Sequence, residues 1–213
     1  PTTSRKPLAY CAAIRSRSAA SRITSASGSV GSGAGATVGK MRGMARATKG
    51  GVGSASITLR SGLTIGAVVA VNAVGDVVDP ATGDVVAGVR TEDGTGFSDA
   101  RVLLREDELQ ATLGQNTTIG AVVTNALLTK AQATKVAQMA QDGLARAIYP
   151  AHTPSDGDAI FTLATGVHTD DVSIATLGAL AADVVAEAIL DAVRSAESRA
   201  GIPAQSELSS NNR

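Results

Sequence analysis

Apolar residues in the first part of this chain follow the period of β-strands. Residues 53–59 alternate small or polar residues with apolar ones, a pattern that predicts a half-buried strand. Residues 64–73 are a nearly continuous apolar run and predict a central strand covered on both faces. Residues 116–124 predict a buried strand of β-branched and small apolar residues, the first residues of which are polar. Residues 75–80 predict a turn and a short strand that stops at a proline, and residues 159–164 predict a further apolar strand.

Two later segments carry the helical period. Thr129 and Gln132 form a Thr-x-x-Gln capping box, and apolar residues then recur at helical spacing as far as Tyr149 and Pro150. A second helix is predicted over residues 173–198, with a broad apolar face that indicates packing against a sheet. Because strands come first and strand–helix pairs follow, the pattern predicts helical layers that cover two stacked sheets.

The same pattern divides the chain into three parts. Residues 1–29 are rich in Ser, Arg and Ala without clear periodicity, and they predict an irregular basic arm. Residues 30–200 predict a single domain or subdomain, in which residues 81–115 form an exposed, variable connection. Residues 201–213 are polar and predict a loose tail. Since the chain begins with Pro1 rather than an initiator Met, we expect it to be a fragment.

Composition narrows the classes of protein and of site. A chain of 213 residues that is 44% hydrophobic can bury a core, and with 2% aromatic residues that core is built from Ala, Val, Leu and Ile. Cys11 is the single cysteine, which excludes a disulfide framework and a cysteine-based zinc site. The sequence holds neither a run of about 18 apolar residues nor a signal-peptide pattern, so we expect a cytoplasmic protein without a membrane partner.

Charge is balanced over the whole chain but unevenly distributed. More than half of the lysines and arginines fall in residues 1–60, and the first carboxylate along the chain is Asp76. Such a basic segment can bind nucleic acid by neutralising phosphates. The sequence lacks the interleaved aromatic residues and the recognition-helix pattern of nucleic-acid-binding proteins. We therefore expect a solvated segment and no nucleic-acid partner.

The glycine-rich run over residues 28–53 suggests a phosphate-binding loop, but its spacing excludes one. A P-loop requires a glycine where Ala34 stands and a serine or threonine where Met41 stands. The dinucleotide fingerprint fails at Val38, where its third glycine is required. The glycines instead predict tight turns or close approach of the backbone to another group, with Lys40 as a projecting cation, and we expect no cofactor.

The polar start of the strand at residues 116–124 carries the first candidate chemistry. If the Asn116–Thr117 bond is cut, Thr117 gains a free α-amine beside its hydroxyl. An α-amino group has a pKa of ~7.7–8.0, so it can accept the hydroxyl proton near neutral pH. One residue would then supply both nucleophile and base. Asn-Thr-Thr is also an ordinary way to begin a strand, so the pattern alone leaves both interpretations open.

Two further polar groups lie next to predicted strands. Asn72 ends the strand at residues 64–73, where its amide either holds the following turn or stabilises an oxyanion; the pattern by itself favours the turn. Asp156-Gly-Asp158 is a tight turn, half of a metal site, or a carboxylate pair that holds a catalytic amine. The neighbouring sequence offers too few ligands for a metal. Neither of the two histidines is assigned a role.

Four motifs in a fixed order resemble the self-processing L-aminopeptidase/D-esterase family, which includes β-peptidyl aminopeptidases, a pantetheine hydrolase and nylon-oligomer hydrolases. The resemblance covers residues 30–205. The motifs are Val71-Asn-Ala-x-Gly-Asp-Val-Val-Asp-Pro80, Asn116-Thr-Thr-Ile-Gly, Asp142-Gly-Leu-Ala-Arg146 and His152-Thr-x-x-Asp-Gly-Asp158. The resemblance implies an α+β fold, an αββα four-layer sandwich similar to the N-terminal-nucleophile hydrolases. It also implies cleavage between residues 116 and 117 into two pieces that stay together.

Each candidate residue takes a role from this resemblance. Thr117 is the nucleophile, as in the branches that use Thr where the aminopeptidase branch has Ser. Asn72 matches the residue that stabilises the oxyanion, an assignment that now outweighs the turn. Asp156 and Asp158 match the acidic pair beside the nucleophile's amine in the nylon-oligomer hydrolase branch, and Lys40 matches its catalytic lysine. The resemblance further implies a small amide or peptide substrate and a homo-oligomer.

The chain departs from the family in one respect. Family members carry an N-terminal portion with further strands and an acidic residue that recognises the substrate's free amine, and nothing in this sequence corresponds to it. We therefore expect an incomplete sandwich with an exposed sheet edge. The favoured hypothesis is a self-processing amide or peptide hydrolase. The alternatives are an inactive remnant of such an enzyme and a protein that binds polyanions through residues 1–60.

Overall fold

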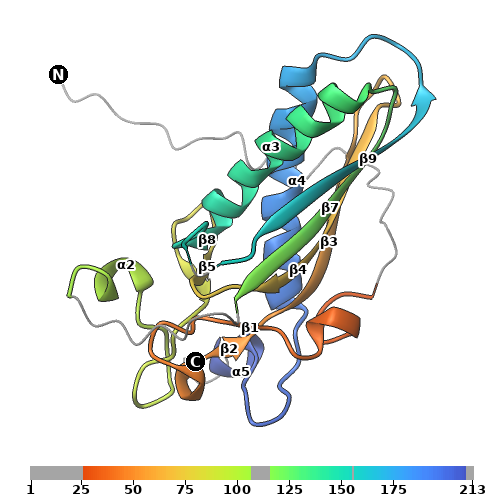
Figure 1. The fold of residues 1–213 in the computed structure, drawn as a ribbon. Coiled ribbons are helices and arrows are strands. Elements are labelled where there is room, and N and C mark those ends of the chain that lie inside the picture. The colour runs from red at the N-terminus through yellow and green to blue at the C-terminus, as the bar shows by residue number, and fades with distance from the viewer. Residues whose placement is uncertain (1–25, 107–115, 155, 210–213) are drawn as a thin grey trace, which may run out of the picture.

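A four-stranded sheet is the centre of the molecule (Figure 1). The computed structural model describes residues 26–106, 116–154 and 156–209. The sheet has the order β3-β4-β7-β9, with β7 and β9 parallel and the other neighbours antiparallel. Its strands are β3 (Gly51–Thr58), β4 (Thr64–Asn72), β7 (Thr117–Ala126) and β9 (Ala159–His168). These positions confirm the four longer strands expected from the apolar runs.

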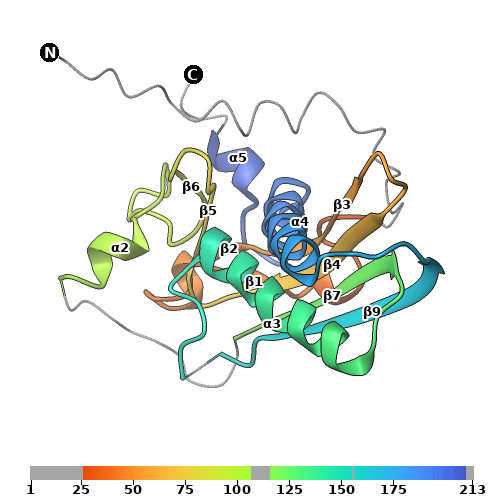
Figure 2. The same cartoon turned by 90° about the horizontal axis from the view of Figure 1, so that it is seen from above.

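Two long helices cover one face of this sheet (Figures 1 and 2). Helix α3 (Lys130–Ala147) begins with the expected capping box, in which Thr129 and Gln132 satisfy each other's backbone N–H groups. Helix α4 (Ile174–Arg194) ends four residues earlier than the apolar pattern predicts. The predicted last turn, residues 195–198, is not helical. There the backbone N–H of Glu197 donates to the Ser29 hydroxyl, at 3.0 Å, instead of to a helical carbonyl.

The core lies between the sheet and these helices and consists of small aliphatic residues, as expected from the low aromatic content. Strand β3 approaches α4 closely, and glycine makes this approach possible. A Cβ atom at Gly53 would overlap the carbonyl oxygen of Ala188, and one at Gly51 would overlap that of Ala192. The glycine-rich run therefore serves close backbone packing here, which is one of the two uses that the sequence predicts.

The opposite face of the sheet carries apolar side chains that stay exposed. Ile119, Phe161 and Leu163 share this face and are 49%, 61% and 54% exposed. Among the described residues, no long helix and no second large sheet covers it. The described residues thus supply one sheet and one helical layer of the expected four-layer arrangement. None of their helices is long and apolar enough to cross a membrane.

Short elements gather at the end of the sheet where β7 begins (Figure 1). Strands β5, β6 and β8 form a small sheet in the order β6-β5-β8, and β1 pairs with β2. These elements are β1 (Thr37–Val38), β2 (Thr48–Lys49), β5 (Asp76–Val78), β6 (Val85–Ala87), β8 (Ile148–Tyr149), the 3-10 turns η1 (Gly31–Gly33) and η2 (Met44–Arg46), and helices α2 (Ala100–Leu103) and α5 (Gln205–Ser209). The connection expected over residues 81–115 thus contains β6 and α2, while residues 107–115 lie outside the described residues.

The two ends of the described chain differ from the irregular arm and the loose tail expected there. The carbonyl of Pro203 accepts a hydrogen bond from the backbone N–H of Lys49 at 2.9 Å, and Ala204 and Leu208 are buried. At the other end, Gly28 pairs with Val52 of β3. The remainder of the predicted basic arm, residues 1–25, lies outside the described residues.

Candidate active site

Strand pairing brings the two main candidates together. Asn72, the last residue of β4, is the cross-strand partner of Thr117, the first residue of β7. Both line a pocket of about 240 Å³, which we call the Thr117 pocket. Its other lining residues are Ser32, Gly35, Ala36, Ala70 and Ile119. The glycine-rich segment therefore forms one wall of this pocket, and the uncovered face of the sheet forms the other.

The carbonyl oxygen of Asn116, at the peptide bond to Thr117, accepts hydrogen bonds from two donors. The Thr117 hydroxyl donates to the Asn116 carbonyl oxygen at 2.5 Å. The backbone N–H of Gly157 donates to the same oxygen at 3.0 Å. Asn116 itself is only 3% exposed. The hydroxyl that the sequence proposes as nucleophile thus lies beside the carbonyl that it would attack, and a second group already polarises that carbonyl.

The side-chain amide of Asn72 has a defined orientation. Its Oδ1 accepts hydrogen bonds from the backbone N–H of Thr37, at 3.1 Å, and from Nζ of Lys40, at 2.9 Å. The lysine also donates to the backbone carbonyl of Asn72 at 3.0 Å. These contacts fix which end of the amide accepts; Nδ2 is its donor end, and Asn72 is one of the residues that line the Thr117 pocket.

Lys40 is buried, which corrects the projecting cation expected from the sequence. Its side chain lies against Asn72, and the residue is 3% exposed. Burial lowers the pKa of Lys40 to about 8, although the nearby carboxylate of Asp156 acts in the opposite direction. A lysine with this pKa is partly neutral near physiological pH and can accept a proton.

A second buried lysine fixes the glycine-rich wall of the pocket. Nζ of Lys49 donates to the carbonyls of Ala34 and Ala36, at 3.0 Å and 2.7 Å. Burial lowers the pKa of Lys49, and the charge of Arg199 lowers it further. Since these donors tie the pocket wall to β2, Lys49 holds the shape of the site rather than facing a ligand.

The two candidate carboxylates lie on either side of the Asn116–Thr117 bond. Asp156 forms a parallel bridge with Asn116, and Oδ1 of Asp158 accepts the backbone N–H of Thr118 at 2.7 Å. Burial raises the pKa of Asp158, and the neighbouring Asp156 carboxylate raises it further. Oδ2 of Asp156 accepts a backbone N–H, while its Oδ1 is buried without a hydrogen-bond partner in the described part of the chain.

All six residues singled out in the sequence therefore meet in one region, and the structure adds three that the sequence did not identify. His152, which received no role, has Nδ1 3.5 Å from Oδ2 of Asp158. Gly157 was visible only as the middle of an Asp-Gly-Asp turn. Thr37 orients Asn72 through its backbone, for which no sequence signal exists. Within the described residues, no cluster of three or more His, Cys, Asp or Glu side chains could hold a metal.

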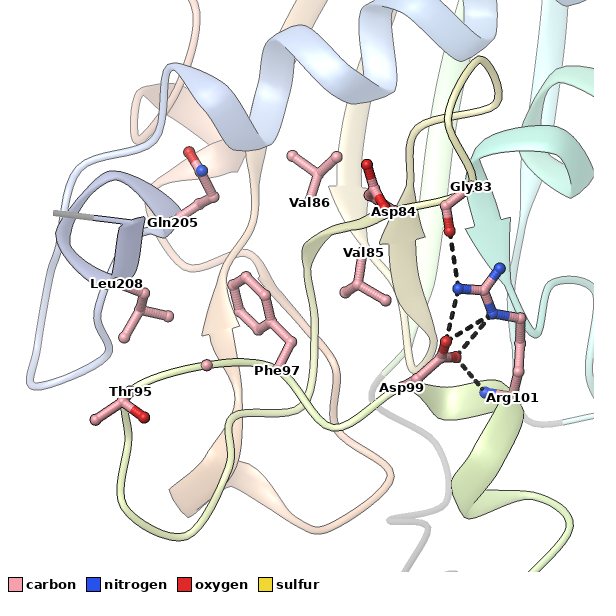
Figure 3. A pocket seen from close by; sticks show the side chains of 11 residues that line it. Gly83, Asp84, Val85, Val86, Thr95, Phe97, Asp99, Arg101, Gln205 and Leu208 are labelled. Carbon is pink, nitrogen blue, oxygen red and sulfur yellow. Dashed lines mark hydrogen bonds and ion pairs between the residues drawn. The ribbon is translucent and has the colours of Figure 1, made fainter. Parts of the chain in front are cut away.

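A larger pocket, of about 460 Å³, lies elsewhere, and we call it the Arg101 pocket (Figure 3). Val85, Phe97 and Leu208 give it an apolar lining. Arg101 forms an ion pair with Asp99 at 2.6 Å and also donates to the carbonyl of Gly83. None of the five residues proposed for catalysis lines this pocket, and neither does Asn116 at the proposed cleavage site.

Curated proteins similar to this chain are named as aminopeptidases and as 6-aminohexanoate-oligomer endohydrolases. An uncharacterized aminopeptidase of Mycobacterium leprae is 46% identical, over 92% of this chain and 55% of that protein. A 6-aminohexanoate-oligomer endohydrolase of a Kocuria species is 31% identical, over 60% of this chain and 40% of that protein. The chain spans about half the length of the curated relatives it matches.

Solved structures share the fold. A β-aminopeptidase of a Burkholderia species superposes with a TM-score of 0.58 and 26% identity, over 87% of this chain and 53% of that one. The L-aminopeptidase D-Ala-esterase/amidase of Ochrobactrum anthropi, a variant of the Ntn-hydrolase fold, gives a TM-score of 0.57 at 22% identity, over 84% and 47%. These likenesses confirm the predicted fold class. The family model of peptidase family S58 matches residues 2–206, and the chain belongs to that family.

Proposed function

We propose that this chain belongs to a self-cleaving amide hydrolase whose nucleophile is Thr117. The observation that carries the proposal is the position of the Thr117 hydroxyl, 2.5 Å from the carbonyl oxygen of the preceding residue and inside a pocket that also holds Asn72. Attack of this hydroxyl on its own peptide bond would release an N-terminal threonine. The free α-amine of that threonine could then act as the base for its own hydroxyl.

Self-cleavage needs a proton acceptor before the α-amine exists. Lys40 suits this task because burial brings its pKa to about 8, near the range in which a base works at neutral pH. Its contact with Asn72 places it next to the pocket wall. After cleavage, the new α-ammonium group needs a carboxylate. Oδ1 of Asp156 is buried and has no hydrogen-bond partner among the described residues, which supports such a role, since Asp156 pairs with Asn116 at the cut.

Turnover of a substrate then follows from the same geometry. The Thr117 hydroxyl attacks the substrate carbonyl while the α-amine takes its proton and passes it to the leaving amine. Nδ2 of Asn72 donates to the oxyanion, a contribution of about 3–4 kcal/mol to the barrier in comparable sites. Water then hydrolyses the ester and regenerates Thr117. Asp158, bound to the backbone next to Thr117, keeps the nucleophile in position.

The substrate class that we propose is a small amide or short peptide. The names of the relatives, an aminopeptidase, a β-aminopeptidase and a 6-aminohexanoate-oligomer hydrolase, have amide hydrolysis in common. The Thr117 pocket is small, and Ala70 and Ile119 make part of its wall apolar, which suits a short acyl group. The homo-oligomeric state and the cytoplasmic location stay predictions.

The test is an intact-mass spectrum of freshly purified protein under denaturing conditions. Self-cleavage predicts two species, of 116 and 97 residues, because 213 − 116 = 97. A panel of small aminoacyl amides would then identify the acyl group. A single 21.2 kDa species that persists for days would contradict self-cleavage and favour the inactive remnant.

Adjacent threonines provide a matched pair of variants. Thr117→Val keeps the shape of the side chain but removes the hydroxyl, so it should abolish both cleavage and turnover. Thr118→Val makes the same chemical change one residue later, on the opposite face of β7. The Thr118 hydroxyl is buried and has no hydrogen-bond partner in the described part of the chain, so this variant should cleave normally. Loss of cleavage in both variants would point to damage to the strand instead.

A further inference from the structure

We propose that Gly157 is a catalytic element of the self-cleavage step: its backbone N–H stabilises the oxyanion that forms on Asn116, and its lack of a side chain leaves room for the attacking hydroxyl of Thr117. This inference rests on the proposed function and assigns a role to the residue between the two candidate carboxylates. It is carried by one hydrogen bond and one steric observation, which are independent of each other.

The hydrogen bond concerns the carbonyl that would be attacked. The N–H of Gly157 donates to the Asn116 oxygen at 3.0 Å. When a nucleophile adds to the carbonyl carbon, that oxygen becomes an oxyanion, and a donor already in place strengthens its bond as the charge develops. Asn72 has a different position, because its amide lines the pocket into which a substrate would enter. Self-cleavage and turnover thus use separate donors.

The steric observation concerns the nucleophile. A Cβ atom added at Gly157 would lie 2.7 Å from Oγ1 of Thr117, whereas the next atoms of that threonine, Cγ2 and Cβ, are 3.6 Å and 3.7 Å away. Gly157 is not among the glycines with positive φ, so the backbone conformation by itself does not require glycine here. The space occupied by the Thr117 hydroxyl is therefore the reason for glycine at this position.

Neighbouring contacts hold the Gly157 amide in place. On one side, Oδ2 of Asp156 accepts the N–H of Thr153 at 2.9 Å; on the other, Oδ1 of Asp158 accepts the N–H of Thr118 at 2.7 Å. Both carboxylates thereby fix the turn that carries the amide. A donor fixed before the reaction needs no reorganisation when charge appears.

Self-cleavage exchanges the Asn116–Thr117 amide bond for an ester, which water then hydrolyses. Oγ1 of Thr117 forms a bond to the Asn116 carbonyl carbon, and the carbonyl π electrons move to the oxygen that Gly157 binds. The C–N bond to Thr117 then breaks, and the hydroxyl proton ends on the departing nitrogen. Water hydrolyses the resulting ester, which leaves a carboxyl group on Asn116 and restores the Thr117 hydroxyl.

The first experiment removes the donor without adding a side chain. Incorporation of glycolic acid at position 157 replaces the N–H by an ester oxygen, and we expect self-cleavage to slow by about a hundredfold. The matched control is an α-hydroxy acid in place of Leu127, which removes the hydrogen bond from its N–H to His168, at 3.1 Å, at the far end of the same strand pair. That control should cleave at the parent rate. Cleavage is followed by intact mass at a temperature well below both melting midpoints.

The second experiment tests the space and does not depend on activity. Thr117→Val and Thr117→Ala both stay uncut, but only valine keeps an atom where Oγ1 lies. Gly157→Ala should lower Tm by several degrees in the Thr117→Val protein and leave it unchanged in the Thr117→Ala protein. Gly96→Ala is the control, because its Cβ would meet nothing closer than 3.9 Å.

The outcomes separate this inference from the proposed function. A parent protein that never cuts overturns both. A parent that cuts, together with a glycolate variant that cuts equally fast, overturns only the role of the Gly157 amide. Equal Tm losses in the Val and Ala backgrounds overturn the steric role. Slow cleavage in the Leu127 control as well would show that any lost strand hydrogen bond has this effect, and the specific role would fail.

Discussion

Charged residues line the Arg101 pocket and lie beside the Thr117 pocket, and their surroundings favour the charged form at the first and the neutral form at the second. In the larger Arg101 pocket, the guanidinium binds Asp99, and these hydrogen bonds hold the pKa of Asp99 below its usual range. Beside the smaller Thr117 pocket, where Lys40 contacts Asn72 and Asp158 binds the backbone of Thr118, burial lowers the pKa of Lys40 and raises that of Asp158. The first pair is stabilised in its charged form, whereas the second set is brought closer to neutrality.

The difference in pKa shifts indicates which pocket has groups beside it that can transfer a proton. A group that is fully ionised and paired neither gives nor takes a proton near neutral pH, while a buried group with a shifted pKa can do both. Pocket volume alone would favour the Arg101 pocket, because this pocket, of about 460 Å³, is the larger of the two, yet its charges are paired. The arrangement of donors around one peptide bond is therefore the better guide to function here.

The largest expected effect comes from removing one cation at each pocket: Lys40, which contacts Asn72 in the wall of the Thr117 pocket, and Arg101, which lines the other. Lys40→Met should slow self-cleavage by about a thousandfold, because a general base typically contributes ~10²–10⁴-fold. Arg101→Met should leave cleavage at the parent rate. The uncut fraction is followed over time on denaturing gels, with thermal melts to verify folding. Equal slowing by both substitutions would break the comparison.

A second, smaller effect concerns the oxyanion donor for turnover. Asn72→Ala should reduce kcat/KM of the mature protein for an amide substrate by about a hundredfold, the usual value of one preorganised donor. Asp99→Ala, in the other pocket, should leave kcat/KM unchanged. The measurement uses protein that has already cleaved, so that maturation and turnover stay separate. Unchanged kcat/KM in the Asn72 variant would remove this residue from the mechanism.

A third effect is a pH dependence specific to the Thr117 pocket. If neutral Lys40, with its pKa of about 8, accepts the proton, the cleavage rate should rise roughly tenfold per pH unit below pH 8 and level off above it. Between pH 6 and pH 8 this amounts to about fiftyfold. The measurement is the cleavage rate at each pH, followed by intact-mass spectra of samples quenched at set times. A rate that falls as pH rises would require a protonated lysine instead, and the Arg101→Met profile should match the parent.

Substitution of Asp76 should have the smallest effect on activity, but it should change the pH dependence of stability. This fully buried carboxylate accepts the N–H groups of Val89 and Ala100, at 2.9 Å and 2.8 Å, and burial raises its pKa to about 7. The folded state therefore holds the proton more tightly than the unfolded state. Its stabilising effect is complete below about pH 4 and is lost as pH rises through about 7, on the order of a few kcal/mol.

Urea unfolding of the uncut Thr117→Val protein at pH 5 and pH 8 measures this effect. We expect the midpoint to be lower at pH 8, and Asp76→Asn in the same background should reduce the difference between the two pH values. An equal pH difference with and without Asp76 would assign the slope to other groups. Cleavage rates in the Asp76 variant should change little at temperatures where it stays folded.

The elements that local sequence determines were predictable. The β-branched run of β4 and the capping box of α3 depend on residues within a few positions of one another, and both lie where the pattern placed them. Helix α5 was not predictable, because its five residues carry no sufficient local signal. It forms where Leu208 is buried and where Pro203 binds Lys49 across a long sequence separation.

The candidate site divides in the same way. The Asn-Thr-Thr start of β7 and the Asp-Gly-Asp turn were visible as unusual polar groups next to apolar strands, and resemblance gave them roles. The contact between Asn72 and Lys40 was not visible, and Lys40 was expected to project. Its burial, and hence its pKa, depends on the residues that surround it in three dimensions.

The sequence by itself determined the strands, the two long helices and the residue types available for chemistry, because apolar period and capping act over a few residues. Only the tertiary structure decided that Asn72 lies opposite Thr117, since strand register is set by pairing between distant segments. The same long-range packing brings the Gly157 N–H within hydrogen-bond distance of the Asn116 carbonyl and buries the side chain of Lys40. Reactivity depends on these distances and on burial, which no local pattern encodes.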